Sequence, residues 1–169
     1  MIYDRVSASI LLAILMNNPT ILYNQRYKLS RKDFTPILFH YYLFGCIENI
    51  ACSGVEEIDA NAITAFITSS DKYKEQYQVL KDNDYVDFIG QYKEIVADSD
   101  KTAEFYYNNV KKYSLVREYK DKGFDITDIY DEGKDESEQR QRLNSLSIDE
   151  ILNHFDSIQV ALKAEYSTE

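Results

Sequence analysis

The sequence has little glycine or proline and no tryptophan. Five glycines and two prolines occur among 169 residues, whereas a domain of many short strands needs such residues at its turns. Leu, Ile, Ala, Lys, Glu and Tyr instead fill long stretches, a composition that favours helices. We therefore predict an all-α fold, with a compact helical globule, a protruding antiparallel helical hairpin and a tethered C-terminal helix.

Residues that bind metals are also scarce. Cys46 and Cys52 are six positions apart, which is neither the spacing of a zinc-binding pair nor one that a single helix bridges by a disulfide; we interpret both as small core residues. His40 and His154 have no second histidine or cysteine at ligand spacing. We interpret His40 as a hydrogen-bonded structural histidine and His154 as solvated, and we predict neither a metal site nor a cofactor.

Sequence motifs of catalysis are missing as well. No Gly-x-x-x-x-Gly-Lys motif, which cradles nucleotide phosphates, occurs. Ser7 and Ser9 have no neighbouring base, and carboxylate pairs such as Glu56-Glu57 stand in polar surroundings that leave their acidities ordinary. We predict that the chain is not an enzyme. With no leader and no apolar run near the ~20 residues of a membrane span, we also expect a cytoplasmic protein that does not bind membranes.

Acidic residues outnumber basic ones, and their distribution is uneven. The net charge of −10 is made up of −2 over residues 1–122, with 15 Lys+Arg and 17 Asp+Glu, and −8 over residues 123–169, with 4 and 12. A surface built to neutralise phosphates needs an excess of Lys and Arg. The charge therefore argues against nucleic acid as the main partner.

The spacing of apolar residues predicts a helical domain over residues 1–122. A first helix over residues 4–17 is apolar nearly all round and belongs in the centre. Thr35-Pro36 begins a second helix that Ser53-Gly54 ends, and Asp59 caps a short third helix. A further helical segment covers residues 71–80.

Two more helices form the predicted hairpin, over about residues 84–121. The polar turn Asp98-Ser99-Asp100 joins them and is short enough to make them antiparallel neighbours. We predict that the second helix associates with another copy of the chain. The residues of this hairpin interface are Phe105, Tyr106, Val110, Tyr113, Val116 and Arg117.

The C-terminal helix carries an apolar stripe that nothing obvious in the same chain covers. Ser147 and Glu150 form a capping box at its start, and the helix extends over residues 147–166. Residues 123–146 before it are acidic and polar, which predicts a flexible linker without a core of its own. The stripe is therefore predicted to dock on a partner, through Ile148, Ile151, Leu152, Phe155, Ile158 and Leu162.

Two alternatives remain open at this point. The last helix could instead fold back on the body of its own chain. Tyr106, Tyr107 and Tyr113, interleaved with Lys111, Lys112 and Arg117, could stack on the bases of single-stranded DNA. The same aromatic residues also make a helix-to-helix seam, which we favour.

Two sets of short motifs, spread along nearly the whole chain, together resemble one protein family. The first set is Ile10-Leu11-Leu12, Asn18-Pro19, Asp33-Phe34, His40, Leu43-Phe44, Ile47, Ile50, Gly54, Ile58-Asp59 and Ile63. The second set is Tyr85-Val86-Asp87-Phe88-Ile89, Tyr106, Val110, Val116-Arg117-Glu118, Asp128-Ile129-Tyr130-Asp131 and the helix from Ser147 to Tyr166. In this order the motifs resemble the N-terminal domain and linker region of the replicative DnaB-type DNA helicases, in their phage and Gram-positive versions.

The resemblance implies a non-catalytic collar of a hexameric ring that acts in DNA replication. Hairpins of neighbouring subunits pair in such a collar, the linker helix docks on the adjacent motor domain, and primase or a helicase loader binds as part of a primosome. The family's RecA-like ATPase is missing, so helicase activity does not carry over. Alternatively, a stand-alone chain of this kind would regulate a host helicase or loader. The family's usual Gly-Gly before the hairpin is replaced by Asn83-Asp84.

Overall fold

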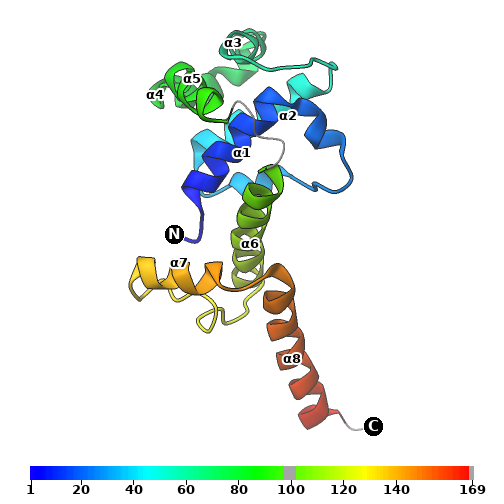
Figure 1. The fold of residues 1–169 in the computed structure, drawn as a ribbon. Helices are drawn as coiled ribbons and strands as arrows, with labels where there is room; N and C mark the ends of the chain where they lie inside the picture. The colour runs from blue at the N-terminus through cyan, green and yellow to red at the C-terminus, as the bar shows by residue number, and fades with distance from the viewer. Residues whose placement is uncertain (97–101, 168–169) are drawn as a thin grey trace. The chain divides into compact units, whose positions relative to one another are not determined.

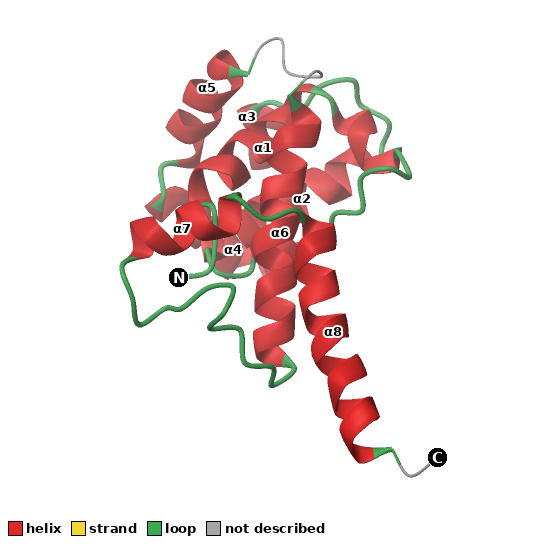
Figure 2. Ribbon diagram, turned by 60° about the horizontal axis from the view of Figure 1, so that its bottom comes forward, coloured by secondary structure: helices red, strands yellow, loops and turns green. Residues whose placement is uncertain are grey.

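The computed structural model describes residues 1–96 and 102–167, and every regular element in these ranges is helical (Figures 1 and 2). The predicted all-α fold is confirmed, while the predicted turn at Asp98, Ser99 and Asp100 lies outside the described residues. The 3-10 helices are η1 (Pro19–Tyr23), η2 (Arg31–Phe34) and η3 (Asp71–Tyr73). The α-helices are α1 (Arg5–Asn17), α2 (Leu38–Ala51), α3 (Ala60–Ile67), α4 (Lys74–Asp82), α5 (Tyr85–Ile95), α6 (Ala103–Asp121), α7 (Glu136–Asn144) and α8 (Ile148–Tyr166).

The chain forms two compact units. The boundary between them follows residue 110, whereas the sequence predicted boundaries after residues 122 and 146. Residues 3–110 make the N-terminal unit, and residues 1–2 with 111–169 make the C-terminal unit. Helix α6 contributes its first part, up to Val110, to the N-terminal unit and the remainder to the C-terminal unit. Each unit has its own cluster of buried apolar side chains.

The N-terminal unit is built around the pair α1 and α2, with α3, α4 and α5 packed on it (Figure 1). Residues Leu11 to Met16 of α1 are all buried, which confirms the central position predicted for an all-round apolar helix. Phe34 stacks on Phe44, with ring centroids 4.8 Å apart. Because the interior is close-packed, these contacts fix how α1, η2 and α2 sit together.

The starts of the helices follow their capping residues in two predicted places and not in a third. The Asp59 carboxylate accepts a hydrogen bond from the Ala62 N–H at 2.8 Å, and Ser147 and Glu150 form the capping box of α8. Helix α2, in contrast, begins at Leu38 rather than at Thr35-Pro36. The Thr35 hydroxyl donates instead to the Lys32 carbonyl at 3.1 Å, at the end of η2.

The two cysteines lie in different environments. Cys46 is buried in the N-terminal core, as predicted, and burial raises the pKa of its thiol to about 12. Cys52 was also predicted to be a core residue, which is wrong, because it is exposed. It follows the last residue of α2, where its thiol donates to the Glu48 carbonyl at 3.4 Å.

Helix α5 packs differently from the predicted hairpin arm. Among the described residues it lies against α1, α3 and α4 rather than along α6. Tyr85, Ile89 and Val96 are buried in the N-terminal core. A short polar connection predicted an antiparallel pair, but the apolar face of α5 is buried against three helices of the globule instead.

A buried hydrogen-bonded chain links α1 to α2 through His40, which is 2% exposed. The Tyr3 hydroxyl lies 2.7 Å from His40 Nδ1, and Ser9 Oγ lies 3.2 Å from His40 Nε2. The Ser9 hydroxyl donates to the Arg5 carbonyl at 2.8 Å, so His40 Nε2–H donates to Ser9 and Tyr3 donates to Nδ1. The interpretation of His40 as a hydrogen-bonded structural histidine is confirmed.

The environment of His40 predicts a loss of stability in mild acid. Burial, and to a lesser degree the charge of Arg5, lower the pKa of His40 from 6.5 to about 4. In the unfolded chain His40 therefore becomes protonated below about pH 6.5, whereas in the folded chain it stays neutral down to about pH 4. Stability falls as the pH falls through this window, by on the order of 2 kcal/mol between pH 7 and pH 5. Urea unfolding followed by circular dichroism measures this.

Two variants isolate the contribution of His40. His40→Gln should flatten the slope of stability against pH above pH 5, whereas Ser9→Ala, which keeps the imidazole and removes only one of its hydrogen bonds, should retain the slope. An unchanged slope in His40→Gln would show that another group titrates in this window.

Asp84 is the one non-glycine residue with positive φ among the described residues, with φ 50° and ψ 52°. Its side chain makes no capping hydrogen bond to α5. The position connects α4 to α5, and the left-handed conformation there is the one that glycine adopts without strain. A glycine at this position would therefore fit the backbone that the chain forms with Asp84.

We expect Asp84→Gly to raise the free energy of unfolding by roughly 0.5 kcal/mol, because the relief of left-handed strain exceeds the added entropy of the unfolded chain. Gln78→Gly, in the middle of α4, should lower it by about 1 kcal/mol. Thermal unfolding of both variants tests the assignment. A destabilised Asp84→Gly protein would mean that the carboxylate itself holds the turn.

Candidate protein-interaction site

The C-terminal unit has a core to which the predicted linker contributes. The second part of α6 supplies Tyr113 and Val116, and Ile2 joins them from the start of the chain. The Arg117 guanidinium fixes that first segment by donating to the Ile2 carbonyl at 2.8 Å. The other buried members of this cluster are Ile126, Ile129, Tyr130, Leu143, Ile151 and Phe155.

The segment of residues 123–146 differs from the predicted featureless linker. It contains α7, whose first turn is capped by Asp135. Ile126, Ile129, Tyr130 and Leu143 are each at most 6% exposed. These four residues are three, one and thirteen positions apart and are separated by many acids, so they do not follow a helical period. For this reason the sequence pattern did not predict this part of the core.

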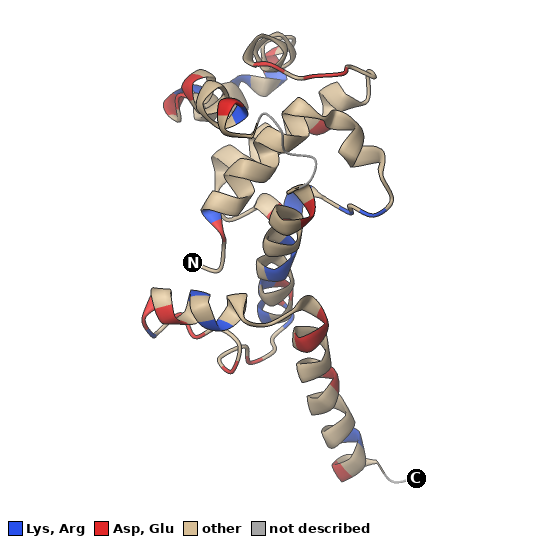
Figure 3. Ribbon diagram, viewed as in Figure 1, with Lys and Arg blue, Asp and Glu red and all other residues tan. Residues whose placement is uncertain are grey.

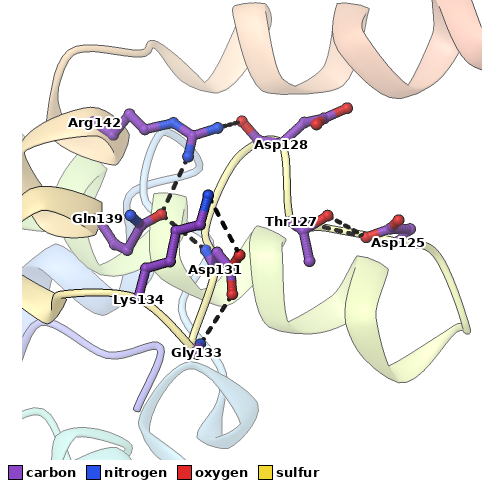
Figure 4. Close-up of polar contacts among 8 residues, drawn as sticks. All are labelled: Asp125, Thr127, Asp128, Asp131, Gly133, Lys134, Gln139 and Arg142. Atoms are coloured by element: carbon purple, nitrogen blue, oxygen red, sulfur yellow. Dashed lines mark hydrogen bonds and ion pairs between the residues drawn. The ribbon is translucent and has the colours of Figure 1, made fainter.

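Polar contacts hold the loop of residues 125–134 against α7, as Figure 4 shows. Gln139, which is 3% exposed, accepts hydrogen bonds from the Asp131 N–H at 2.9 Å and from the Arg142 guanidinium at 3.2 Å. The same guanidinium donates to the Asp128 carbonyl. One buried amide thus satisfies two donors, and the backbone of an acidic loop gains a fixed position.

Two tight turns shape the same loop. The Thr127 N–H and hydroxyl both donate to Asp125, at 3.0 and 2.7 Å, and lower the pKa of that carboxyl. The Gly133 N–H donates to Asp131 at 2.9 Å. These local bonds are typical of Asx turns, in which an aspartate takes the place of a backbone acceptor.

The first half of α8 packs within its own unit. Ile151 and Phe155 are at most 2% exposed, and the Phe155 ring stacks on Tyr119 with centroids 3.8 Å apart. Phe124 meets the same ring edge-on at 5.6 Å. The prediction that nothing in the chain covers the stripe is therefore wrong for this half, where the fold-back alternative holds. His154 beside it is half-buried rather than solvated.

The second half of α8 has no such cover among the described residues. Ile158 is 38% exposed and Leu162 is 47% exposed, and Tyr166 continues the same face at 73%. In both views this half extends past the other helices of its unit (Figures 1 and 2). We call Ile158, Leu162 and Tyr166 the outer stripe. Ile148 and Leu152, the remaining predicted docking residues, are half-buried.

Charged groups mark the junction between α6 and α8. The stem of Lys112 is largely buried, and burial lowers its pKa, an effect that the charge of Glu150 partly offsets. The Glu150 carboxylate also accepts from the Ser147 N–H at 3.4 Å in the capping box. The start of α8 is thus fixed by its cap, and the positive charge of Lys112 lies close enough to attract Glu150.

The predicted hairpin interface separates into core and surface. Val110, Tyr113 and Val116 are at most 2% exposed, so their side chains are already covered within the two units. Phe105 is 62% exposed and Tyr106 is half-buried. These two residues are what the structure leaves for association with another copy, which stays a prediction.

Neither a metal site nor a membrane-spanning helix occurs in residues 1–96 and 102–167. No group of three or more His, Cys, Asp or Glu side chains there could hold a metal ion. No helix in those ranges is long and apolar enough to cross a membrane. The outer stripe of α8 is therefore the candidate site that the geometry presents most clearly.

The chain is similar, over nearly its whole length, to a protein derived from a prophage. The SPbeta prophage-derived uncharacterized protein YorI of Bacillus subtilis strain 168 is 30% identical over 173 residues, which cover 99% of this chain and 33% of YorI. The chain thus spans about a third of the length of this curated relative. No protein-family model and no solved structure matches the chain.

The stack of Phe155 on Tyr119 predicts where α8 is most sensitive to mutation. We expect Phe155→Ala to destabilise the C-terminal unit by about 3 kcal/mol, because a buried ring is lost and a cavity remains. Amide hydrogen exchange of α7 and α8 measures this locally. Leu162→Ala, at an exposed position of the same helix, should change exchange little, and equal effects of the two variants would contradict the burial described here.

Proposed function

We propose that this chain is a non-catalytic scaffold module of a replicative DNA helicase. It associates with further copies, to a hexamer in the full-length context, and docks on the neighbouring motor domain, with primase or a helicase loader as additional partners, in the cytoplasm of a bacterial or phage-infected cell. The outer stripe of α8 is the observation that carries the proposal.

The outer stripe has the physical properties of a docking surface. Its helix is anchored by Ile151 and Phe155, so the exposed half is already ordered before any partner arrives. Binding to a preformed helix avoids much of the ordering entropy that a disordered tail would cost. Covering each partly exposed side chain of the stripe contributes on the order of 1 kcal/mol, which suits a contact that is repeated around a ring.

The sequence comparison supports the proposal in two respects. The relative YorI derives from a prophage, and the motifs described above resemble phage versions of the replicative helicases. Two thirds of YorI lie outside the region that this chain matches. A module of this kind therefore occurs in a longer protein, which is the setting that a scaffold tier requires.

A pair of matched double variants tests the outer stripe. Ile158→Asp with Leu162→Asp should weaken binding to the separately purified motor domain of the helicase that contains this module at least tenfold, because two charges then replace apolar contacts. Val160→Asp with Ala164→Asp makes the same charge change on the opposite face of α8 and should leave binding nearly unchanged. Sedimentation of the chain with and without the motor domain measures both.

The same sedimentation data distinguish the possible failures. Equal loss of binding in both double variants would show that charge, not the stripe, is responsible. No binding by the unmodified chain would remove the docking proposal. Binding by a chain whose reading frame ends at Glu169, rather than continuing into a P-loop, would favour a regulator of the host helicase over a tier of it.

A further inference from the structure

A basic loop stands out in this acidic chain. Between Arg5 and Lys32 the sequence contains no Asp or Glu. Four cations fall within the nine residues 24–32, which we call the basic loop. Two of them lie in the connection between η1 and η2, part of which is blue in Figure 3, and the other two lie in η2. The next acid, Asp33, is fully buried and accepts from the Ser30 N–H at 2.9 Å. The cations of the basic loop are Arg26, Lys28, Arg31 and Lys32.

Aromatic contacts hold the basic loop on the first part of α6. The Tyr27 and Tyr107 rings meet edge to face, with centroids 5.0 Å apart. The Lys28 N–H donates to the Tyr107 hydroxyl at 3.0 Å, and the Arg26 guanidinium lies 5.9 Å from the centre of the Tyr27 ring. The loop is therefore an ordered surface rather than a loose charged segment.

A further ring stands at the start of the loop. Tyr23 is 58% exposed although its hydroxyl donates to the Ala51 carbonyl at the end of α2. The hydrogen bond fixes the position of the phenol while much of the ring stays open to solvent. A fixed, exposed aromatic ring is a stacking platform that costs little entropy when a flat ligand covers it.

The acids near the loop orient its arginines without neutralising them firmly. Arg26 pairs with Glu104, and Arg31 lies 3.5 Å from Glu48; all four side chains are at least 43% exposed. Exposed ion pairs of this kind are worth at most about 1 kcal/mol, so a phosphate can replace the carboxylate.

We propose that the basic loop, together with Tyr23, binds single-stranded nucleic acid, with the cations on phosphates and the ring on an unpaired base. Stacking on an exposed ring needs an unpaired base, which a duplex does not offer. An acidic protein would use the cations but would leave the ring without a flat partner. This inference does not depend on the proposed docking function, since it uses no residue of α8.

Binding of the full chain to a fluorescent dT20 oligonucleotide tests the proposal. Contacts to three or four phosphates give a slope of about −2 to −3 in a plot of log binding constant against log salt. The affinity should accordingly fall roughly 15- to 60-fold between 50 and 200 mM salt. Arg26→Gln with Lys28→Gln and Lys32→Gln should weaken binding at least tenfold at 50 mM salt and flatten the slope.

Matched variants separate this site from general charge. Lys72→Gln with Lys74→Gln and Lys81→Gln makes the same charge change on η3 and α4 and should bind dT20 as the unmodified chain does. Tyr23→Leu should weaken binding about fivefold or more, with the salt slope unchanged, whereas Tyr166→Leu, at a tyrosine that is still more exposed, should have no effect. Circular dichroism confirms that each variant is folded.

Three results would overturn the proposal. Equal weakening by the two triple variants would mean that net charge, not the basic loop, is sensed. Equal affinity for duplex DNA would remove the single-stranded preference. Binding of polyglutamate as tight as that of dT20, with no effect of Tyr23→Leu, would assign the loop to an acidic protein instead.

Discussion

The contact between Phe155 and Tyr119 determines what α8 can do. Two rings stacked at 3.8 Å hold the middle of α8 on α6, and Ile151 one turn earlier is fully buried beside them. Past this anchor, Ile158 and Leu162 are 38% and 47% exposed. Without the stack the whole stripe would be an untethered apolar surface, which favours aggregation over specific docking. The anchor restricts the exposed part to a short, positioned face.

The anchor in turn depends on an acidic segment that folds. Gln139 and Arg142 hold the loop of residues 125–134 on α7, and this allows Ile126, Ile129 and Tyr130 to enter the core. A buried amide left without partners would cost more than it contributes, but Gln139 receives two donors. The polar network therefore makes it possible for a segment with few apolar residues to complete a core.

The sequence was sufficient for most features that depend on neighbouring residues, although the start of α2, predicted at Thr35-Pro36, is an exception. The all-helical character of the fold, the cap at Asp59 and the capping box at Ser147 depend on contacts within four residues, and all three were predicted correctly. Features that depend on distant residues were missed, such as the burial of Phe155 on Tyr119. For the same reason, a nucleic-acid site was considered on α6 alone, where Lys112 and Tyr113 prove to be buried. Tyr27 and Tyr107 are eighty positions apart, and only the fold brings them together.

The distribution of charge lets the two proposed surfaces select different partners. Residues 5–32 carry five cations and no acid, whereas residues 123–169 carry 4 cations and 12 acids. A phosphate backbone is attracted by the first and repelled by the second, because such interactions act over about 10 Å at moderate salt. A partner of the outer stripe must instead present an apolar groove, preferably with a basic rim to match the acids of α8. Nucleic acid and protein therefore need not compete for one site, which is a requirement for any module that holds proteins together on DNA.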